Sequence, residues 1–459
     1  MTERKIPLRS QLDPQYTWAT TDLYPTDKDW EAQIPQIQAM VEKLKACKGT
    51  LGKSSQNLLA FLKLEDEFEL LADPFACYAM YKKDQDTRDP NAQKMSGVMM
   101  NLLVQADEAV AFAGPEILEI SDQDMDRFYQ EEPGLEHYRL ALTRLRREKE
   151  HTLSQSEEAL LASAGKLGQS PGTIYNLLGD ADLPFPDAVD KDGNRHALSQ
   201  GTFIPMEQSA DRELRRSAFE NFYSAYGQFR NTFASTLEAQ MKQLQFFSGA
   251  RKYPSPLQAA LSANEIPVEI YHNLIQAVHQ GFSAMHRYMR LRKQLLGVDE
   301  LHYYDIYTPL VPDQDEQIPF EQAKEIALEA LAPLGEDYLN MLREGFSNRW
   351  IDVYENQGKR SGAYSSGIYG HHPFVLLNYA DTLNDVFTLV HEMGHALHSY
   401  LSGKHQSVTY ANYRIFVAEV ASTCNESILM QHLLGQTEDP KRRAYLINYF
   451  LEQFRTTLY

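Results

Sequence analysis

Residues 381–401, DTLNDVFTLVHEMGHALHSYL, constrain the fold more than any other part of the sequence. Their apolar side chains recur mostly at steps of three and four residues, which is the spacing of one face of an α-helix. Asp381 or Thr382 is placed to cap the start of this helix, Asp385 falls in its first turn, and Gly403 is placed to end it. We therefore expect a long helix with one face packed against the protein. That face comprises Leu383, Val386, Phe387, Val390, Gly394, Leu397 and Leu401.

Most of the remaining sequence also has helical periodicity. Of its 459 residues, 43% are hydrophobic and 23% are charged, so the chain can bury a large core without disulfides. Two stretches interrupt the helical pattern. In residues 168–205, Asp192-Gly193 predicts a β-hairpin turn. Residues 350–379 contain four glycines and an apolar run, and they predict one or two strands joined by turns.

Charge and cysteine content exclude several classes of protein. Lys and Arg number 44 against 63 Asp and Glu, a net charge of −19, which argues against nucleic-acid and anionic-membrane binding. The three cysteines are widely spaced, which argues against a disulfide framework. The polar start has no apolar segment of a secretory signal, and no run is long enough to span a membrane. We expect a cytoplasmic protein, and the sequence predicts no oligomeric state.

The long helix contains His391, Glu392 and His395 in the order His-Glu-Met-Gly-His. Residues i and i+4 lie one turn apart on the same helix face, so the two imidazoles can bind one Zn²⁺. Glu392 lies about 100° around the helix from His391 and can reach a water on the metal. In zincins, the two histidines are ligands and the glutamate is the general base. The motif also arises by chance in roughly 3% of chains of this length, so it needs support from other residues.

A zinc site of this kind needs a third protein ligand. His398 can be that ligand, a hydrogen-bond partner of a ligand, or a packing residue. Because it lies two turns, about 10.8 Å, from His391, we favour a partner of a ligand or a substrate contact. Glu419 is the better ligand candidate, since a carboxylate among apolar neighbours in residues 411–434 is costly unless paired or metal-bound. Glu426 can accept a proton from a ligating imidazole, or it is a surface carboxylate.

The sequence as a whole resembles oligoendopeptidase F, the bacterial branch of the thimet-oligopeptidase-like zinc peptidases. The most specific segments are HEMGHALHSY, FVAEVASTCNE, GKRSGAYSSGIY and PFVLLNYADTLNDVFTLV, and weaker similarity reaches upstream to YTWATTDLYPTDKDWE. The resemblance implies a mainly α, two-lobed helical zincin with a small β element beside the active-site helix and a deep substrate channel. We expect an N-terminal helical lobe over residues 1–200 and a zinc peptidase domain over residues 201–459.

The resemblance also implies roles for individual residues. The ligands of one Zn²⁺ per chain fall on His391, His395 and Glu419, and the general base falls on Glu392. The partner of a ligand falls on Glu426. Residues 361–369 resemble the strand that lies along the substrate backbone in relatives. Further candidates for contact with substrate are Tyr364, Tyr369, His371, His372, His398, Tyr410 and Tyr413, although tyrosine is equally a packing residue.

Members of the family continue beyond the position where this chain stops, at Tyr459 within a predicted helix. Their additional segment carries histidine and tyrosine side chains that stabilise the oxyanion, so we expect a C-terminal truncation. The predicted function is zinc-dependent endopeptidase activity on short, unstructured oligopeptides. The alternative is a catalytically impaired fragment that binds peptide or zinc, and turnover distinguishes the two. A helical scaffold with an accidental motif is a third hypothesis, which metal content would test.

Overall fold

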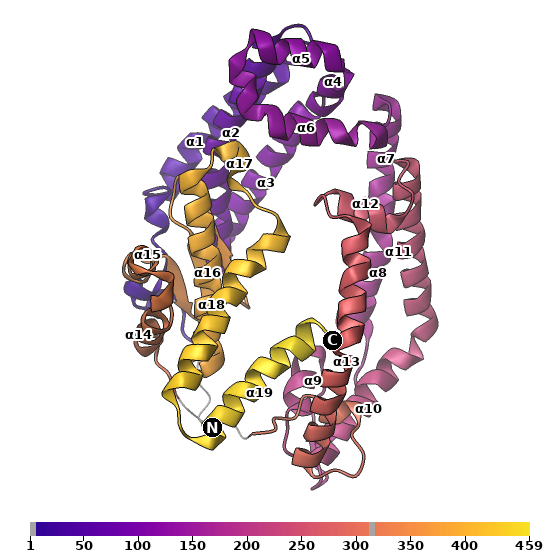
Figure 1. Cartoon of the computed structure of the whole chain (residues 1–459), viewed down its shortest axis with the longest axis vertical. Helices are drawn as coiled ribbons and strands as arrows, with labels where there is room; N and C mark the ends of the chain where they lie inside the picture. Colours follow the sequence, from indigo (N-terminus) through magenta and orange to yellow (C-terminus); the bar gives the residue numbers. More distant parts are fainter. Residues whose placement is uncertain (1–5, 312–316) are drawn as a thin grey trace. The chain divides into compact units, whose positions relative to one another are not determined.

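The computed structural model describes residues 6–311 and 317–459 and is mainly α-helical (Figure 1). It divides into two compact units, each built from two stretches of chain. Unit 1 comprises Met1–Lys149 and Asp315–Gln436, and unit 2 comprises Glu150–Gln314 and Thr437–Tyr459. The predicted linear division at residue 200 is a different kind of boundary and stays a prediction, as does the predicted channel.

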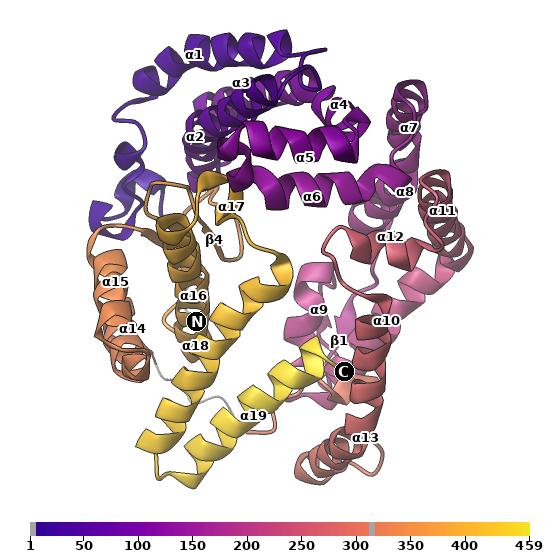
Figure 2. The ribbon, with the colours of Figure 1, turned by 45° about the horizontal axis from the view of Figure 1, so that its top comes forward.

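Unit 1 consists of helices and a small sheet. Its first stretch forms α1 (Asp27–Ala46), α2 (Ser55–Gln85), α3 (Pro90–Val110), α4 (Ala113–Glu119), α5 (Asp122–Glu131) and α6 (Arg139–Arg147). Its second stretch forms α14 (Phe320–Ala330), α15 (Glu336–Ser347), β3 (Ile351–Tyr354), β4 (Tyr364–Ser366), β5 (Phe374–Tyr379), α16 (Leu383–His405), α17 (Val408–Ala411) and α18 (Ile415–Gln436). Helices α1, α2 and α3 pack on one another (Figure 2).

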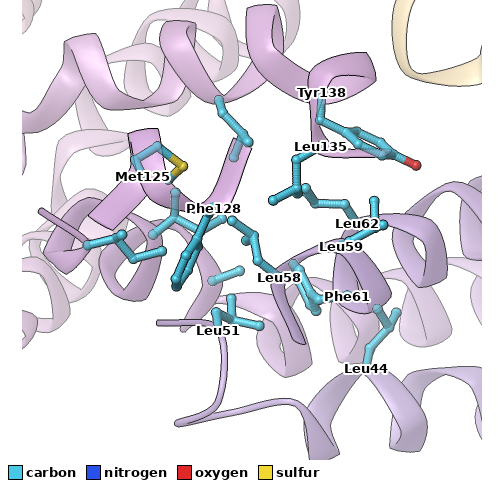
Figure 3. Close-up of a cluster of buried hydrophobic side chains, with 14 residues drawn as sticks. Leu44, Leu51, Leu58, Leu59, Phe61, Leu62, Met125, Phe128, Leu135 and Tyr138 are labelled. Carbon is cyan, nitrogen blue, oxygen red and sulfur yellow. The ribbon is translucent and has the colours of Figure 1, made fainter. Parts of the chain in front are cut away.

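Helix α2 is the longest helix of the described chain and organises one of the cores of unit 1. Ser54 caps it by accepting a hydrogen bond from the Asn57 backbone N–H, which satisfies one of the free donors at the helix start. Leu58 and Phe61 on its buried face are fully shielded from solvent and pack with Phe128 of α5 (Figure 3). Burying large apolar side chains supplies the main driving force for this packing.

The sheet of unit 1 has the strand order β3-β5-β4. The central strand β5 is buried along most of its length. Its Phe374 packs in a cluster with Trp18 and Tyr81, and the strand also contacts α16. Strand β3 pairs with it in parallel and β4 pairs with it antiparallel. Among the described residues, β4 is paired only with β5 and therefore forms an edge, and it contacts α16. The predicted small β element beside the helix is confirmed, with three strands instead of one or two.

Unit 2 is also helical. It contains α7 (Gln155–Gly168), α8 (Ser170–Leu177), β1 (Ala188–Val189), β2 (Arg195–His196), α9 (Gln200–Glu207), α10 (Arg212–Gln228), α11 (Arg230–Ala250), α12 (Pro256–Ser262), α13 (Val268–Leu296) and α19 (Pro440–Thr457). The predicted hairpin is confirmed as the antiparallel pair β1–β2. Its turn needs a glycine, since Gly193 has φ +84°, a region that other residues rarely adopt.

The structure corrects one predicted helix boundary and bears on the question of membrane-spanning helices. The helix predicted for residues 381–401 does not end at Gly403 but continues to His405 as α16. A glycine inside a helix, such as Gly403, costs up to about 1 kcal/mol relative to alanine. No helix among the described residues is long and apolar enough to cross a membrane.

Candidate metal centre

Helix α16 begins at the cap that the sequence predicts. Thr382 Oγ1 accepts a hydrogen bond from the Asp385 backbone N–H at 3.2 Å. The Asp385 carboxylate in turn accepts one from the Thr382 backbone N–H at 3.0 Å. This reciprocal capping box satisfies two donors at the helix start. The start of the helix that carries the histidines is therefore set by local interactions.

Helices α16 and α18 lie side by side (Figure 1) and cross closely where the histidine motif lies. Gly394 makes this approach possible. A Cβ atom at this position would lie 2.8 Å from Ser422 Cα and 3.0 Å from the Ala421 carbonyl oxygen. A larger residue would push the helices apart, so the glycine between the two histidines brings Glu419 within reach of them.

The structure brings His391, His395 and Glu419 together. The Nε2 atoms of the two histidines lie 3.1 Å apart, and Glu419 Oε2 lies 3.5 Å from each of them. A tetrahedral zinc ion holds nitrogen and oxygen ligands at about 2.0–2.1 Å, which places neighbouring ligand atoms about 3.3 Å apart. Two imidazole nitrogens and one carboxylate oxygen at these separations fit such an ion.

Neighbouring side chains orient two of these three groups. Glu426 Oε1 lies 2.5 Å from His391 Nδ1, so the carboxylate can accept the Nδ1 proton and leave Nε2 free as a ligand. Ser422 Oγ donates to Glu419 Oε2 at 2.8 Å. Sequence analysis identified Glu426 but missed Ser422, whose spacing of three residues from Glu419 on one helix was the available signal.

Glu392 is buried beside the three grouped residues, with 7% of its surface exposed. Burial raises its pKa to about 7, with His391 opposing the rise and Glu419 and Glu426 adding to it. A pKa in this range suits a group that accepts and releases protons near neutral pH. A cation bound by the adjacent residues would lower that pKa and favour the carboxylate form.

Comparison with known proteins decides the family. The model of peptidase family M3 matches residues 205–459, and the model described as oligopeptidase F matches residues 116–185. Oligopeptidase PepF of Bacillus subtilis is 42% identical over 455 residues, which cover 99% of this chain and 68% of that protein. The chain belongs to peptidase family M3. It is a metallo-endopeptidase similar to oligoendopeptidase F.

Other proteins similar to this M3 peptidase support the same family. Group B oligopeptidase PepB of Streptococcus agalactiae is 38% identical over 98% of this chain and 75% of that protein. The crystal structure of oligoendopeptidase F from Enterococcus faecium has a TM-score of 0.66 at 34% identity, over 94% of this chain and 72% of the other. The crystal structure of a protein from Chlamydophila abortus described as a peptidase has a TM-score of 0.90, also at 34% identity, over 98% of this chain and 76% of the other. The comparisons confirm the mainly α zincin fold and do not support the predicted C-terminal truncation.

His398 of the M3 peptidase lies on the same helix as the grouped histidines, but it is not one of them. Its ring stacks on Tyr413, with ring centroids 3.8 Å apart and 17° between the ring planes. Its Nδ1 is shielded from solvent and has no hydrogen-bond partner. The stack is with Tyr413 and not with His391, His395 or Glu419. The predicted role of His398 therefore stays a prediction.

The predicted substrate contacts do not gather at one place. The Tyr364 hydroxyl donates to Asp84 Oδ2 at 2.7 Å, and the Tyr410 hydroxyl donates to the His137 carbonyl at 2.8 Å. Both hydroxyls therefore hold parts of unit 1 together. Their acceptors are 280 and 273 positions away in the sequence, so no local sequence pattern could predict these hydrogen bonds. Contact with substrate at either residue stays a prediction.

Tyr369 and His371 lie closer to α16. Tyr369 lines a cavity of about 190 Å³ together with Ser399 and Tyr413. His371 lines a neighbouring cavity of about 420 Å³ that shares Ser399 as a wall. Both cavities lie at the C-terminal half of α16, beyond the histidine motif and next to the end of β4. Tyr369 and His371 therefore each border a cavity near α16, and contact with substrate at either residue stays a prediction.

Proposed function

We propose that this chain is a zinc-dependent endopeptidase that hydrolyses short, unstructured oligopeptides. The observation that carries the proposal is the group formed by His391, His395 and Glu419, whose ligand atoms all lie within 4.8 Å of one another. Two imidazoles and one carboxylate are a donor set that zinc binds in catalytic sites with an open fourth position. Calcium and magnesium prefer oxygen ligands, which the two histidines do not offer.

The chain's own residues supply the remaining chemistry. When bound, zinc acts as a Lewis acid and lowers the pKa of a bound water to about 7. Glu392 takes the proton from the attacking water and later delivers it to the leaving amine. Glu426 holds the proton on His391 Nδ1, and Ser422 holds Glu419 Oε2 in place. Because Glu392 is buried, its proton exchange with bulk water is restricted, which favours delivery to the substrate.

The edge strand β4 supports a peptide as substrate. An extended peptide can pair with the free edge of a sheet through its backbone, which needs no particular side chains. Strand β4 contacts α16, so a peptide added to this edge would run beside the helix that carries Glu392. Folded proteins present few extended, unpaired segments, so this mode of binding selects short, unstructured chains.

An impaired fragment that binds peptide or zinc without turnover is not favoured, because the matched relatives are named as peptidases or oligopeptidases. Hydrolysis of an internally quenched peptide by the zinc-loaded 459-residue chain, with a chelator control, tests this directly. Cleavage that the chelator abolishes supports the proposal. No cleavage at stoichiometric zinc would favour the impaired fragment instead.

Two variants test the assigned roles. Glu392→Gln keeps the ligand group and is expected to bind zinc but lose cleavage by about 10²–10⁴-fold, the usual contribution of a general base. His391→Ala is expected to lose the metal as well. Glu238→Gln changes an exposed glutamate on α11 that pairs with Lys242 and serves as the matched control. Cleavage by Glu392→Gln at the rate of the unchanged chain would contradict the assignment of the base.

A further inference from the structure

Tyr413 lies in the short link between α17 and α18, and its side chain packs on α16. Its ring stacks on His398, and its hydroxyl forms a hydrogen bond with Ser399 Oγ at 2.7 Å. Two consecutive residues of α16 therefore hold Tyr413. The same helix carries His391 two turns before this contact and His395 one turn before it.

The first turns of α18 bury little apolar surface. Four of their apolar side chains are largely exposed, namely Ile415 at 66%, Phe416 at 69%, Val417 at 41% and Val420 at 60%. Ala418 is buried at 8% exposure but contributes only a methyl group. The helix becomes well buried only from Ser422 onwards, where Ser422 and Asn425 are 0% and 2% exposed. Apolar burial therefore does little to hold the start of α18 in place.

Glu419 belongs to this weakly packed part. Its side chain is 54% exposed, yet its Oε2 lies 3.5 Å from the Nε2 atoms of both histidines. Burial raises the pKa of the Tyr413 hydroxyl, the hydrogen bond with Ser399 opposes the rise, and the Glu419 carboxylate adds to it. The hydrogen bond from Ser422 orients the Glu419 side chain. Because both residues belong to α18, this bond does not fix the position of the first turn of α18 against α16.

We propose that Tyr413 is a positioning residue for the metal centre. Through the stack on His398 and the hydrogen bond to Ser399, it holds the first turn of α18 against α16. This contact keeps the Glu419 carboxylate at ligand distance from His391 and His395. The inference rests on the proposed function, because it assumes that these three residues bind a divalent cation.

The experiment measures zinc affinity of the full chain by competition with a chromogenic chelator. Tyr413→Leu removes both the stack and the hydrogen bond, and we expect about 10–100-fold weaker binding, as for other groups that orient metal ligands. Tyr413→Phe keeps the stack and is expected to recover most of the affinity. Tyr303→Leu changes a largely exposed tyrosine of unit 2 and is expected to bind zinc as the unchanged chain does.

A second background separates positioning from a general structural role. If Tyr413 acts through Glu419, then Tyr413→Leu should cause no further loss of affinity in a chain that already carries Glu419→Ala. The same fold-loss in both backgrounds would overturn the inference, and so would unchanged affinity of Tyr413→Leu alone. Cobalt absorption should show the same change of ligand field in Tyr413→Leu and Glu419→Ala.

His391→Ala keeps the failure of this inference distinct from the failure of the proposed function. If His391→Ala binds zinc as tightly as the unchanged chain, the proposed metal centre is wrong. If His391→Ala loses zinc while Tyr413→Leu does not, only the role of Tyr413 is wrong. Thermal unfolding of the metal-free variants controls for misfolding, and Tyr413→Phe provides a milder change where Tyr413→Leu folds poorly.

Discussion

Two buried groups of ionisable side chains, one in each unit, are balanced in opposite ways. In unit 2, Asp305 is completely buried. Arg212 donates to its Oδ2 at 2.8 Å and Arg215 to its Oδ1 at 2.9 Å. Burial alone would raise the pKa of Asp305, but these hydrogen bonds outweigh it and lower that pKa to about 2. The chain supplies its own cations here.

In the proposed metal centre of unit 1 the charges are not balanced in this way. The groups that act on Glu392 are one imidazole, His391, and two carboxylates, Glu419 and Glu426. Neither lysine nor arginine is among them, and the pKa of Glu392 rises to about 7. Carboxylates near one another resist ionisation unless a cation is added.

The difference separates a structural ion-pair network from a site that needs a ligand. A buried carboxylate that two arginines satisfy is complete and holds helices in place. A group of carboxylates and imidazoles without such partners becomes complete when it binds a divalent cation. The comparison agrees with the metal centre proposed from the ligand geometry of His391, His395 and Glu419, and four experiments test it.

The largest expected effect is on the stability of unit 2. Asp305→Ala leaves Arg215, whose side chain is 4% exposed, buried without its carboxylate partner, so we expect a loss of about 3–5 kcal/mol. Urea unfolding measures this loss. Glu213→Ala breaks an exposed pair with Arg216 and should cost at most about 1 kcal/mol. Equal losses for the two variants would contradict a network that is completed by its arginines.

The metal centre should respond to metal where the Asp305 network does not. Zinc at about 100 times its dissociation constant should stabilise the folded chain by about 2.7 kcal/mol, because the folded state presents all three ligands. A chelator should remove this gain, and His391→Ala should never show it. Asp305→Asn should keep it. Urea unfolding with and without zinc measures all three, and an undiminished gain in His391→Ala would contradict the assigned ligands.

Acid should weaken the Asp305 network. The pKa of Asp305 is lowered from 3.8 to about 2, so its contribution is complete above about pH 4 and is lost as the pH falls through about 2. The difference corresponds to about 2 kcal/mol. The stability difference between the unchanged chain and Asp305→Asn should shrink by about this amount between about pH 5 and about pH 2. A difference independent of pH would contradict the lowered pKa.

The smallest expected effect concerns the orientation of Glu419. Ser422→Ala removes the hydrogen bond to Glu419 Oε2 and should weaken zinc binding by about 10-fold. Ser427→Ala, on the same helix, removes only a bond to the Thr423 carbonyl and should leave zinc affinity unchanged. A competition titration measures both. The same affinity in both variants would show that Ser422 does not orient the ligand.

The parts of the site that could be predicted from sequence are those with local signals. His391, Glu392 and His395 lie within five consecutive residues, so helical geometry alone places them together. The Thr382–Asp385 cap follows the same logic. Glu419 needed its apolar neighbours and the family resemblance, because 28 residues of chain separate it from His391.

The wrong boundary at Gly403 and the dispersed tyrosines show what local signals miss. Glycine ends many helices, but Gly403 lies inside α16. The hydroxyls of Tyr364 and Tyr410 donate to residues 280 and 273 positions away. No periodicity or spacing predicts such partners, since they depend on how distant segments pack.

The sequence by itself determined the helical class, the helix that carries the histidine motif, the hairpin at Asp192-Gly193 and the resemblance to a peptidase family. These follow from residue spacing over one or two turns, which the backbone geometry of a helix or a turn dictates. Only the tertiary structure decided that Gly394 lets α18 approach, that Ser422 donates to Glu419 Oε2, and that Tyr413 packs on His398. These depend on side chains from separate helices meeting in space, which local sequence does not encode.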